Sequence, residues 1–170
     1  GRWRLVKPAP FKYVAAATVD EVVATLTEHG DEAKVLAGGQ SLVPLMNLRL
    51  AVPGVLVDVN RVAELQGIST NGAVDVGAVT RQAGLERSAE AQAAVPITGH
   101  ALRHVAFPGV RSRGTVGGSI AHADPASELC AVLLPDAGHL LELFQTWTPD
   151  KATQHRILVS NPAKLYGFPN

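Results

Sequence analysis

Apolar positions near the start of the chain recur at helical spacing. Val22 and Leu26 follow Thr18, and a glutamate stands three residues after that threonine. This order matches a capping box, in which the two polar side chains satisfy amide groups at a helix start. Gly30 follows the last apolar position, and glycine commonly ends helices. We therefore predict a helix between Thr18 and Gly30, after an extended, proline-rich segment over residues 1–13.

Two short apolar runs flank a second helical segment. Residues 34–37 and 55–59 are predicted to be buried strands, because short apolar runs bounded by turn residues are typical of strands. Between them, Ser41 is a candidate cap for a helix over 42–48, where a proline in the first turn is tolerated. Residues 18–59 are thus predicted to form helix, strand, turn, helix and strand in that order.

In the middle of the chain, the turn residues and candidate caps predict a hairpin followed by helices. The hairpin is centred on residues 70–72, because an Asn-Gly pair there favours a tight turn. Thr80 and Asp124 are candidate caps for helices, the latter with Pro125 at the first helical position. Residues 107–119 are rich in glycine and proline and are expected to be mainly loop. The predicted helices are 80–87, 97–105 and 126–134.

Composition narrows the class of protein. Of 170 residues, 46% are hydrophobic and 18% are charged, which is enough apolar material for a core. Fifteen basic residues balance fifteen acidic ones, and this balance argues against a broad nucleic-acid surface. The single cysteine, Cys130, excludes an internal disulfide framework and a cysteine metal cluster. No apolar run approaches the ~18 residues of a membrane span, so we expect a soluble, cytoplasmic protein.

Two glycine pairs are the candidate ligand-binding elements of the sequence. Gly38-Gly39 ends a predicted strand and is followed by Ser41 at a helix start. Gly117-Gly118 is likewise followed by Ser119. Glycines let the backbone approach a ligand, and amide groups at a helix start can hold a phosphate. Two such turns can face each other across a diphosphate, although an ordinary strand-to-helix turn remains the alternative for each pair.

The residues around both turns carry a family resemblance. The segments are Ala37-Gly38-Gly39-Gln40-Ser41-Leu42 and Arg113-Gly114-Thr115-Val116-Gly117-Gly118-Ser119, the latter continuing through His122 and Asp124 to Glu128. Residues 7–134 resemble the FAD-binding medium subunit of the molybdenum hydroxylases, the family of carbon monoxide dehydrogenase and xanthine dehydrogenase. The resemblance implies an α+β, two-lobed FAD-binding domain of the PCMH type, truncated, with subdomains at 1–60 and 61–134.

The same resemblance implies a cofactor, partners and site residues. The cofactor is FAD, and the chain would be an electron-transfer component beside a molybdenum-binding large subunit and an iron–sulfur small subunit. No catalytic residue is expected, because the flavin performs the redox chemistry. For Asp124 a helix cap, and for His122 a loop position without a ligand, stay open as alternatives. The implied cofactor-binding residues are Ala37, Gly38, Gly39, Gln40, Ser41, Thr115, Val116, Gly117, Gly118, Ser119, His122, Asp124 and Glu128.

The character of the sequence changes near residue 135. Residues 135–170 resemble the C-terminal end of a metal-dependent amidohydrolase of the TIM-barrel kind, through a stretch that runs from Asn161-Pro162-Ala163 to Tyr166-Gly167-Phe168. A helical tail is expected there, and no metal site, because no His-x-His pair is present. We therefore hypothesise a fusion or deletion product. A non-catalytic remnant with weak or no FAD binding, and more weakly a hydrolase, are the alternative functions.

Overall fold

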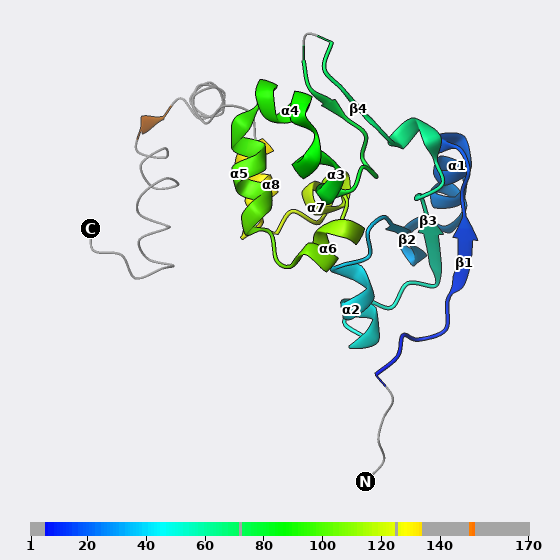
Figure 1. Ribbon diagram of the computed structural model, residues 1–170. Helices are drawn as coiled ribbons and strands as arrows, with labels where there is room; N and C mark the ends of the chain where they lie inside the picture. The colour runs from blue at the N-terminus through cyan, green and yellow to red at the C-terminus, as the bar shows by residue number, and fades with distance from the viewer. Residues whose placement is uncertain (1–5, 72, 125, 134–149, 152–170) are drawn as a thin grey trace, which may run out of the picture. The chain divides into compact units, whose positions relative to one another are not determined.

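The computed structural model describes residues 6–71, 73–124, 126–133 and 150–151 (Figure 1). By its internal contacts the chain divides into two compact units, Gly1–Leu133 and Leu134–Asn170. The elements below all belong to the first unit. The tail predicted for residues 135–170 lies outside the described residues, apart from Asp150 and Lys151.

A three-stranded parallel sheet forms the first half of this unit. Its strands are β1 (Lys12–Ala15), β2 (Ala33–Leu36) and β3 (Val55–Asp58), in the order β1-β3-β2. Parallel neighbours need crossover connections, and helices α1 (Val19–His29) and α2 (Leu42–Asn47) lie in the two connecting segments. The predicted α+β class is confirmed, and so is the helix–strand–helix–strand order.

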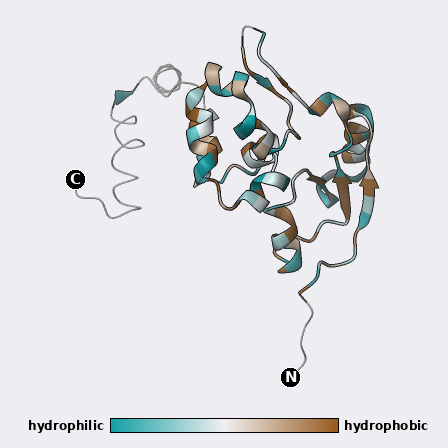
Figure 2. Ribbon diagram, in the orientation of Figure 1, coloured by the Kyte–Doolittle hydropathy of each residue, from teal (hydrophilic) through white to brown (hydrophobic). Residues whose placement is uncertain are grey.

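The three strands differ in burial because of their places in the sheet. Val55, Leu56 and Val57 on the central strand β3 are all buried, and β3 is drawn largely in brown, the colour of hydrophobic residues, in Figure 2. On β2, by contrast, Val35 is 43% exposed, so the prediction of a buried strand was wrong there. An edge strand has only one neighbour, and part of its surface stays uncovered. Strand β1, expected only as extended chain, completes the sheet on the other side of β3.

Helix α1 begins and ends as its sequence predicts. The Thr18 hydroxyl accepts a hydrogen bond from the Glu21 amide (3.2 Å), and the Glu21 carboxylate accepts one from the Ala17 amide (2.7 Å). Gly30 is the C-cap, at a φ of 51°. Ser41 precedes α2 as expected, but its side chain makes no capping hydrogen bond. The amide groups that α2 presents at its start are therefore not satisfied by this serine.

The second half consists of a hairpin and short helices. The hairpin pairs β4 (Ile68–Ser69) with β5 (Asp75–Val76), which confirms the predicted hairpin with a longer connection than a two-residue turn. A 3₁₀ turn, Ala63–Leu65, precedes the hairpin, and another, Gly30–Glu32, follows α1 in the first half. The helices are α3 (Gln82–Arg87), α4 (Ala89–Ala94), α5 (Pro96–His104), α6 (Pro108–Arg113), α7 (Val116–His122) and α8 (Glu128–Leu133).

Residues 107–119, expected as loop, are mostly helical. Pro108 occupies the first turn of α6, where its fixed φ suits a helix. Thr115 is the N-cap of α7 and accepts a hydrogen bond from the Gly118 amide (3.2 Å). The glycine content that indicated a loop is tolerated because both helices are short, Pro108 suits the start of α6, and Thr115 caps α7.

Two predicted caps were also wrong. The Thr80 hydroxyl bonds both backbone groups of Gly67, accepting from its amide (3.1 Å) and donating to its carbonyl (2.8 Å), so it is not available to cap α3. Asp124 lies well before α8, which begins at Glu128, and its carboxylate accepts from the Ala126 amide (2.9 Å) in a local turn. In both cases the polar side chain bonds a backbone group that does not belong to the start of the observed helix.

Two hydrophobic cores hold the unit together, both built from aliphatic side chains. One core contains side chains from the sheet and from α1, and the other contains side chains from the later helices. Val62 and Val79 belong to the first core, although they follow β3 in the sequence. Among the described residues, none of the helices has both the length and the apolar character needed to cross a bilayer. The second core comprises Leu85, Ala91, Leu102, Val116 and Leu129.

Candidate functional site

The two glycine turns lie directly against each other. A Cβ atom built on Gly38 would stand 2.6 Å from the Arg113 carbonyl oxygen and 2.9 Å from the Thr115 nitrogen. One built on Gly118 would stand 3.3 Å from the Cβ of Ala37. Only glycine at position 38 leaves room for this approach of the two backbones. The prediction that the two turns converge is confirmed.

Asn60 and Arg81 tie the two turns together. The Asn60 amide nitrogen donates to the Ala37 carbonyl oxygen (2.8 Å), which lies at the start of the first turn. The Arg81 guanidinium donates to the Asn60 side-chain oxygen (2.8 Å) and to the Arg113 carbonyl oxygen in the second turn. These bonds link β3, the first turn and the second turn through two side chains. Neither residue was among the predicted site residues.

Asp58 orients Asn60 from the end of β3. Its carboxylate accepts hydrogen bonds from the Asn60 backbone amide (2.8 Å) and side-chain amide (2.6 Å), and from the Tyr13 hydroxyl. Burial alone would raise the pKa of Asp58, but the hydrogen bonds from Tyr13 and Asn60 outweigh it and hold that pKa below its usual value. The hydrogen bond to Asp58 also raises the pKa of Tyr13. An ionised carboxylate therefore anchors the network at neutral pH.

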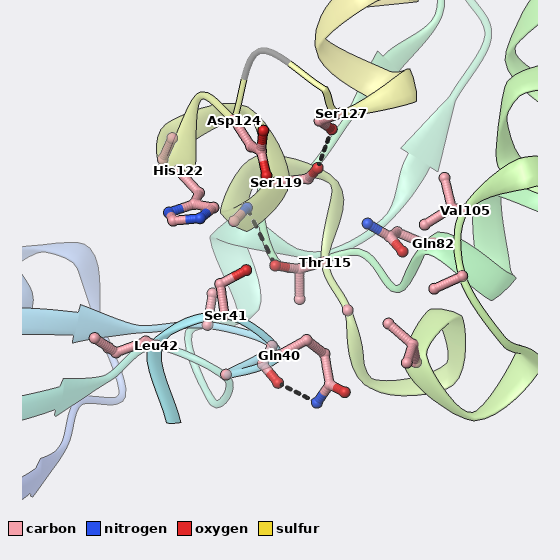
Figure 3. Close-up of a pocket in the computed structure, with 18 of the residues that line it drawn as sticks. Gln40, Ser41, Leu42, Gln82, Val105, Thr115, Ser119, His122, Asp124 and Ser127 are labelled. Atoms are coloured by element: carbon pink, nitrogen blue, oxygen red, sulfur yellow. Dashed lines mark hydrogen bonds between the residues drawn. The ribbon is translucent and has the colours of Figure 1, made fainter. Parts of the chain in front are cut away.

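A cleft of about 610 Å³ opens where the turns meet (Figure 3). Its volume falls within the range of about 300–1,000 Å³ typical of small-molecule sites. Most of the predicted site residues line it, and they come from the end of β2, the start of α2, helix α7 and the start of α8. These lining residues are Ala37, Gly38, Gly39, Gln40, Ser41, Thr115, Gly118, Ser119, His122, Asp124 and Glu128.

Two predicted residues are not brought to the cleft. Val116 is 3% exposed and packs in the second hydrophobic core. A Cβ on Gly117 would stand 2.6–2.7 Å from atoms of Ala78, so Gly117 allows α7 to lie directly on the backbone of that residue. Sequence reasoning grouped both with the cofactor contacts because they stand inside the motif. The structure gives them the packing that positions the second turn.

The amide groups of the second turn are already bonded within the protein. Gly117 donates to the Ala78 carbonyl oxygen (2.9 Å). Gly118 donates to the Thr115 hydroxyl (3.2 Å), and Ser119 donates to the Thr115 carbonyl (3.2 Å). The expectation that both turns present free amide groups to a phosphate was therefore wrong for the second turn.

The first turn has the opposite arrangement. Its carbonyl groups are occupied, because Asn60 bonds the Ala37 oxygen and the Gln40 side chain bonds the Gly38 oxygen (3.0 Å). The backbone amides of residues 38–41 have no hydrogen-bond partner within the described part of the chain. Gly39 adopts a φ of 71°, which turns the chain sharply here. A run of unpaired amides in such a turn is a binding arrangement for an anion.

The opposite wall was missed by sequence reasoning. Gln82, Val105, Ala106 and Val110 line the cleft beside the second turn. Gln82 stood inside a predicted helix, and nothing in its local sequence indicates that it lines a cleft. Asn60 did have a signal, because it follows the carboxyl end of a parallel strand, where ligand sites of such sheets gather.

The arrangement defines a class of protein, an α+β domain with a glycine-rich turn of unpaired amides at the end of a parallel strand. Residues 9–140 match the family described as the FAD binding domain in molybdopterin dehydrogenase. The chain belongs to this family, whose cofactor is FAD, and the resemblance stated from the sequence is confirmed.

Known relatives share the same region. The chain is 47% identical over 130 residues to the 6-hydroxypseudooxynicotine dehydrogenase complex subunit alpha of Paenarthrobacter nicotinovorans, covering 76% of this chain and 44% of that protein. It is 43% identical over 135 residues to the carbon monoxide dehydrogenase medium chain of Hydrogenophaga pseudoflava, and this match covers 79% of this chain and 47% of that protein. A solved structure also matches, that of carbon monoxide dehydrogenase from Hydrogenophaga pseudoflava which lacks the Mo-pyranopterin moiety. It superposes with a TM-score of 0.70 at 46% identity, and the match covers 72% of this chain and 43% of that chain. The chain thus spans less than half of the relatives it matches.

A shorter match concerns a different class of protein. Over 34 residues the chain is 53% identical to the 4-sulfomuconolactone hydrolase of Rhizobium radiobacter, covering 20% of this chain and 11% of the hydrolase. The resemblance proposed for residues 135–170 stays a prediction.

Proposed function

We propose that this chain binds FAD in the cleft between the two glycine turns and serves as an electron-transfer component of a molybdenum hydroxylase-type oxidoreductase. The observation that supports this most is the set of unpaired amides at residues 38–41, held against the second turn at the edge of a 610 Å³ cleft. A diphosphate supplies the negative charge and acceptor oxygens that such amides lack. Family membership independently points to the same ligand.

The two turns would then have different tasks. Residues 38–41 hold the diphosphate, and the Ser41 hydroxyl adds a donor at the same edge. Glu128 begins α8 and lines the cleft, so its carboxylate can accept from a sugar or ribityl hydroxyl. His122 and Asp124 are exposed at the rim. Bound FAD supplies the redox chemistry, and the chain binds and orients it.

Partners and location form part of the same proposal. We expect a molybdenum-binding large subunit and an iron–sulfur small subunit, in the cytoplasm. Exposed apolar side chains after the first turn, on α2 and the segment that follows it, support a surface covered by a partner. These are Val43, Leu48, Leu50 and Val52. The predicted subdomain boundaries, 1–60 and 61–134, also remain proposals.

FAD titration followed by flavin fluorescence tests the proposal. The purified chain is expected to bind FAD and to turn yellow. Gly38→Ala is expected to lose at least tenfold in affinity, because its Cβ would stand 2.6 Å from the Arg113 carbonyl and push the turns apart. Gly109→Ala is the matched control, since a Cβ there meets nothing within 4 Å. A colourless wild-type chain with native circular dichroism and no FAD uptake would support the remnant alternative instead.

A further inference from the structure

A second cavity, of about 540 Å³, is lined in part by the first glycine turn. It shares residues 37–40 with the larger cleft, but its other walls come from different residues. Arg81, just before α3, and Arg113, at the end of α6, line this cavity and do not line the larger cleft. The volume is typical of small-molecule sites. We call this cavity the arginine pocket, and it is lined by residues 36–40, Val43, Pro44, Asn60, Arg81 and Arg113.

Neither arginine of this pocket is neutralised by a carboxylate of the described residues. The ion pairs found among those residues involve other side chains, and no acidic residue lines the pocket. Arg113 is exposed, and its side chain makes no hydrogen bond within the described part of the chain. The Asp58 carboxylate of the neighbouring network accepts from Tyr13 and Asn60 instead. Two positive charges that line one cavity without a counter-charge attract an anion.

Three hydrogen-bond acceptors in the wall of the arginine pocket are occupied by donors of the protein itself. The Ala37 carbonyl oxygen accepts from the Asn60 side chain (2.8 Å). The Gly38 carbonyl oxygen accepts from the Gln40 side chain (3.0 Å), the bond drawn at Gln40 in Figure 3. The Asn60 side-chain oxygen accepts from the Arg81 guanidinium (2.8 Å). A ligand in this pocket therefore meets free donors rather than free acceptors, which selects an oxyanion.

The Arg81 guanidinium is held in a fixed orientation. It is half-buried and donates to the Asn60 side-chain oxygen and to the Arg113 carbonyl oxygen. A guanidinium has five N–H groups, so these two bonds leave others available to a ligand. Because the side chain is already ordered, it loses little conformational entropy when it binds an oxyanion. Arg81 is thus a preformed donor, and the exposed Arg113 side chain is a second one.

We propose that the arginine pocket binds a small organic oxyanion, a carboxylate or phosphate group on an apolar body, at a site separate from that of FAD. The oxyanion bonds the guanidinium groups of Arg81 and Arg113, whose planar forks suit its oxygens. The apolar body contacts Leu36 and Pro44 in the same cavity. The unpaired amides of residues 38–41 remain with the diphosphate in the larger cleft. The site goes beyond the proposed function, because its ligand does not depend on bound FAD.

Phenyl phosphate and benzoate test the pocket, because each joins an oxyanion to an apolar ring. Each probe is titrated into the purified chain by isothermal titration calorimetry at constant ionic strength. Arg113→Gln is expected to weaken the tighter probe about tenfold, because a charge-assisted hydrogen bond is lost. Its melting temperature is expected to stay unchanged, since the exposed side chain has no partner among the described residues. The tighter probe identifies the oxyanion as phosphate or carboxylate.

Arg87→Gln is the matched control. Arg87 is exposed and lines neither cavity, so its loss changes the net charge equally without touching the pocket. The affinity for both probes is expected to stay at the wild-type value. An equal loss of affinity in Arg113→Gln and Arg87→Gln would show a general charge effect and would overturn the proposal. Absence of binding of both probes to the wild type would overturn it as well.

Saturation with FAD distinguishes the arginine pocket from the cofactor cleft. The probe is expected to keep its affinity within about twofold when FAD is bound. Loss of probe binding on addition of FAD would overturn the separate site, because the arginines would then belong to the dinucleotide site. If the wild type takes up no FAD, the proposed function fails, and the titrations of phenyl phosphate and benzoate still decide whether the pocket binds an oxyanion.

Discussion

The two glycine turns have similar sequences and different chemistry. In the second turn Thr115 caps α7, and the amides of Gly117 and Gly118 are bonded to the protein. In the first turn Ser41 makes no cap bond, and the amides of residues 38–41 stay unpaired. A glycine pair with a hydroxyl residue shortly after it is therefore not sufficient to identify a run of unpaired amides. The partners of the amide groups decide it.

Asn60→Ala is expected to have the largest effect on this comparison, because Asn60 joins Asp58, Ala37 and Arg81. Its removal leaves the Ala37 carbonyl and the Arg81 guanidinium without this partner. We expect a loss of about 2–3 kcal/mol in the free energy of unfolding, measured by urea denaturation. FAD binding should also fall by more than tenfold, because the first turn is no longer held against the second.

Gln66→Ala provides the comparison for that variant. Gln66 bonds the Asn60 carbonyl (3.0 Å) from an exposed position, so its loss removes one contact from the same residue and leaves the link between the turns. A small change in both readouts is expected. If Asn60→Ala bound FAD as tightly as the wild type, the view that this side chain holds the turns together would be wrong.

Two substitutions that each remove one hydroxyl group test the roles of the two turns separately. Thr115→Val removes the α7 cap and is expected to cost about 1 kcal/mol of stability. Ser41→Ala removes a hydroxyl that caps nothing, so stability should change by less than about 0.5 kcal/mol. FAD affinity is expected to fall for Ser41→Ala at unchanged stability. The reverse result, with Ser41→Ala unstable and normal in binding, would contradict the division of tasks.

The smallest expected effect is on pH dependence. The folded protein holds the pKa of Asp58 below its usual value, with Tyr13 among the causes. The ionised carboxylate therefore stabilises the fold above the unfolded pKa of about 4, and this contribution is lost as the pH falls through the lower folded pKa. Tyr13→Phe removes one hydrogen bond to the carboxylate. Its stability should fall less steeply than that of the wild type in acid, as measured by urea denaturation from about pH 5 downwards.

Local signals were reliable where the interaction itself is local. The capping box at Thr18 and the C-cap at Gly30 were predicted and found, because both depend on residues within one helical turn. The helices at 108–113 and 116–122 were missed, because their glycines and prolines indicated a loop. Thr80 was misassigned because Gly67, thirteen residues away in sequence, takes its hydroxyl.

The predictions for the candidate site also succeeded where the signal is local and failed where it is not. The motif identified Gly38 and Gly118 as neighbours of one cleft, but it also included Val116, which is buried in a core. Gln82 could not be placed from its own neighbourhood, and the local signal for Asn60 was its position after a predicted strand. Their roles depend on contacts with Gly114 and Ala37, which come from distant parts of the chain.

By itself, the sequence determined the class, the family and the two glycine turns, because glycine spacing and helix caps depend on the conformational preferences of a few adjacent residues. Only the tertiary structure decided which turn keeps unpaired amides and which distant side chains line the cleft. Each backbone group has few hydrogen-bonding positions, and whether they are filled depends on which distant segment packs beside it.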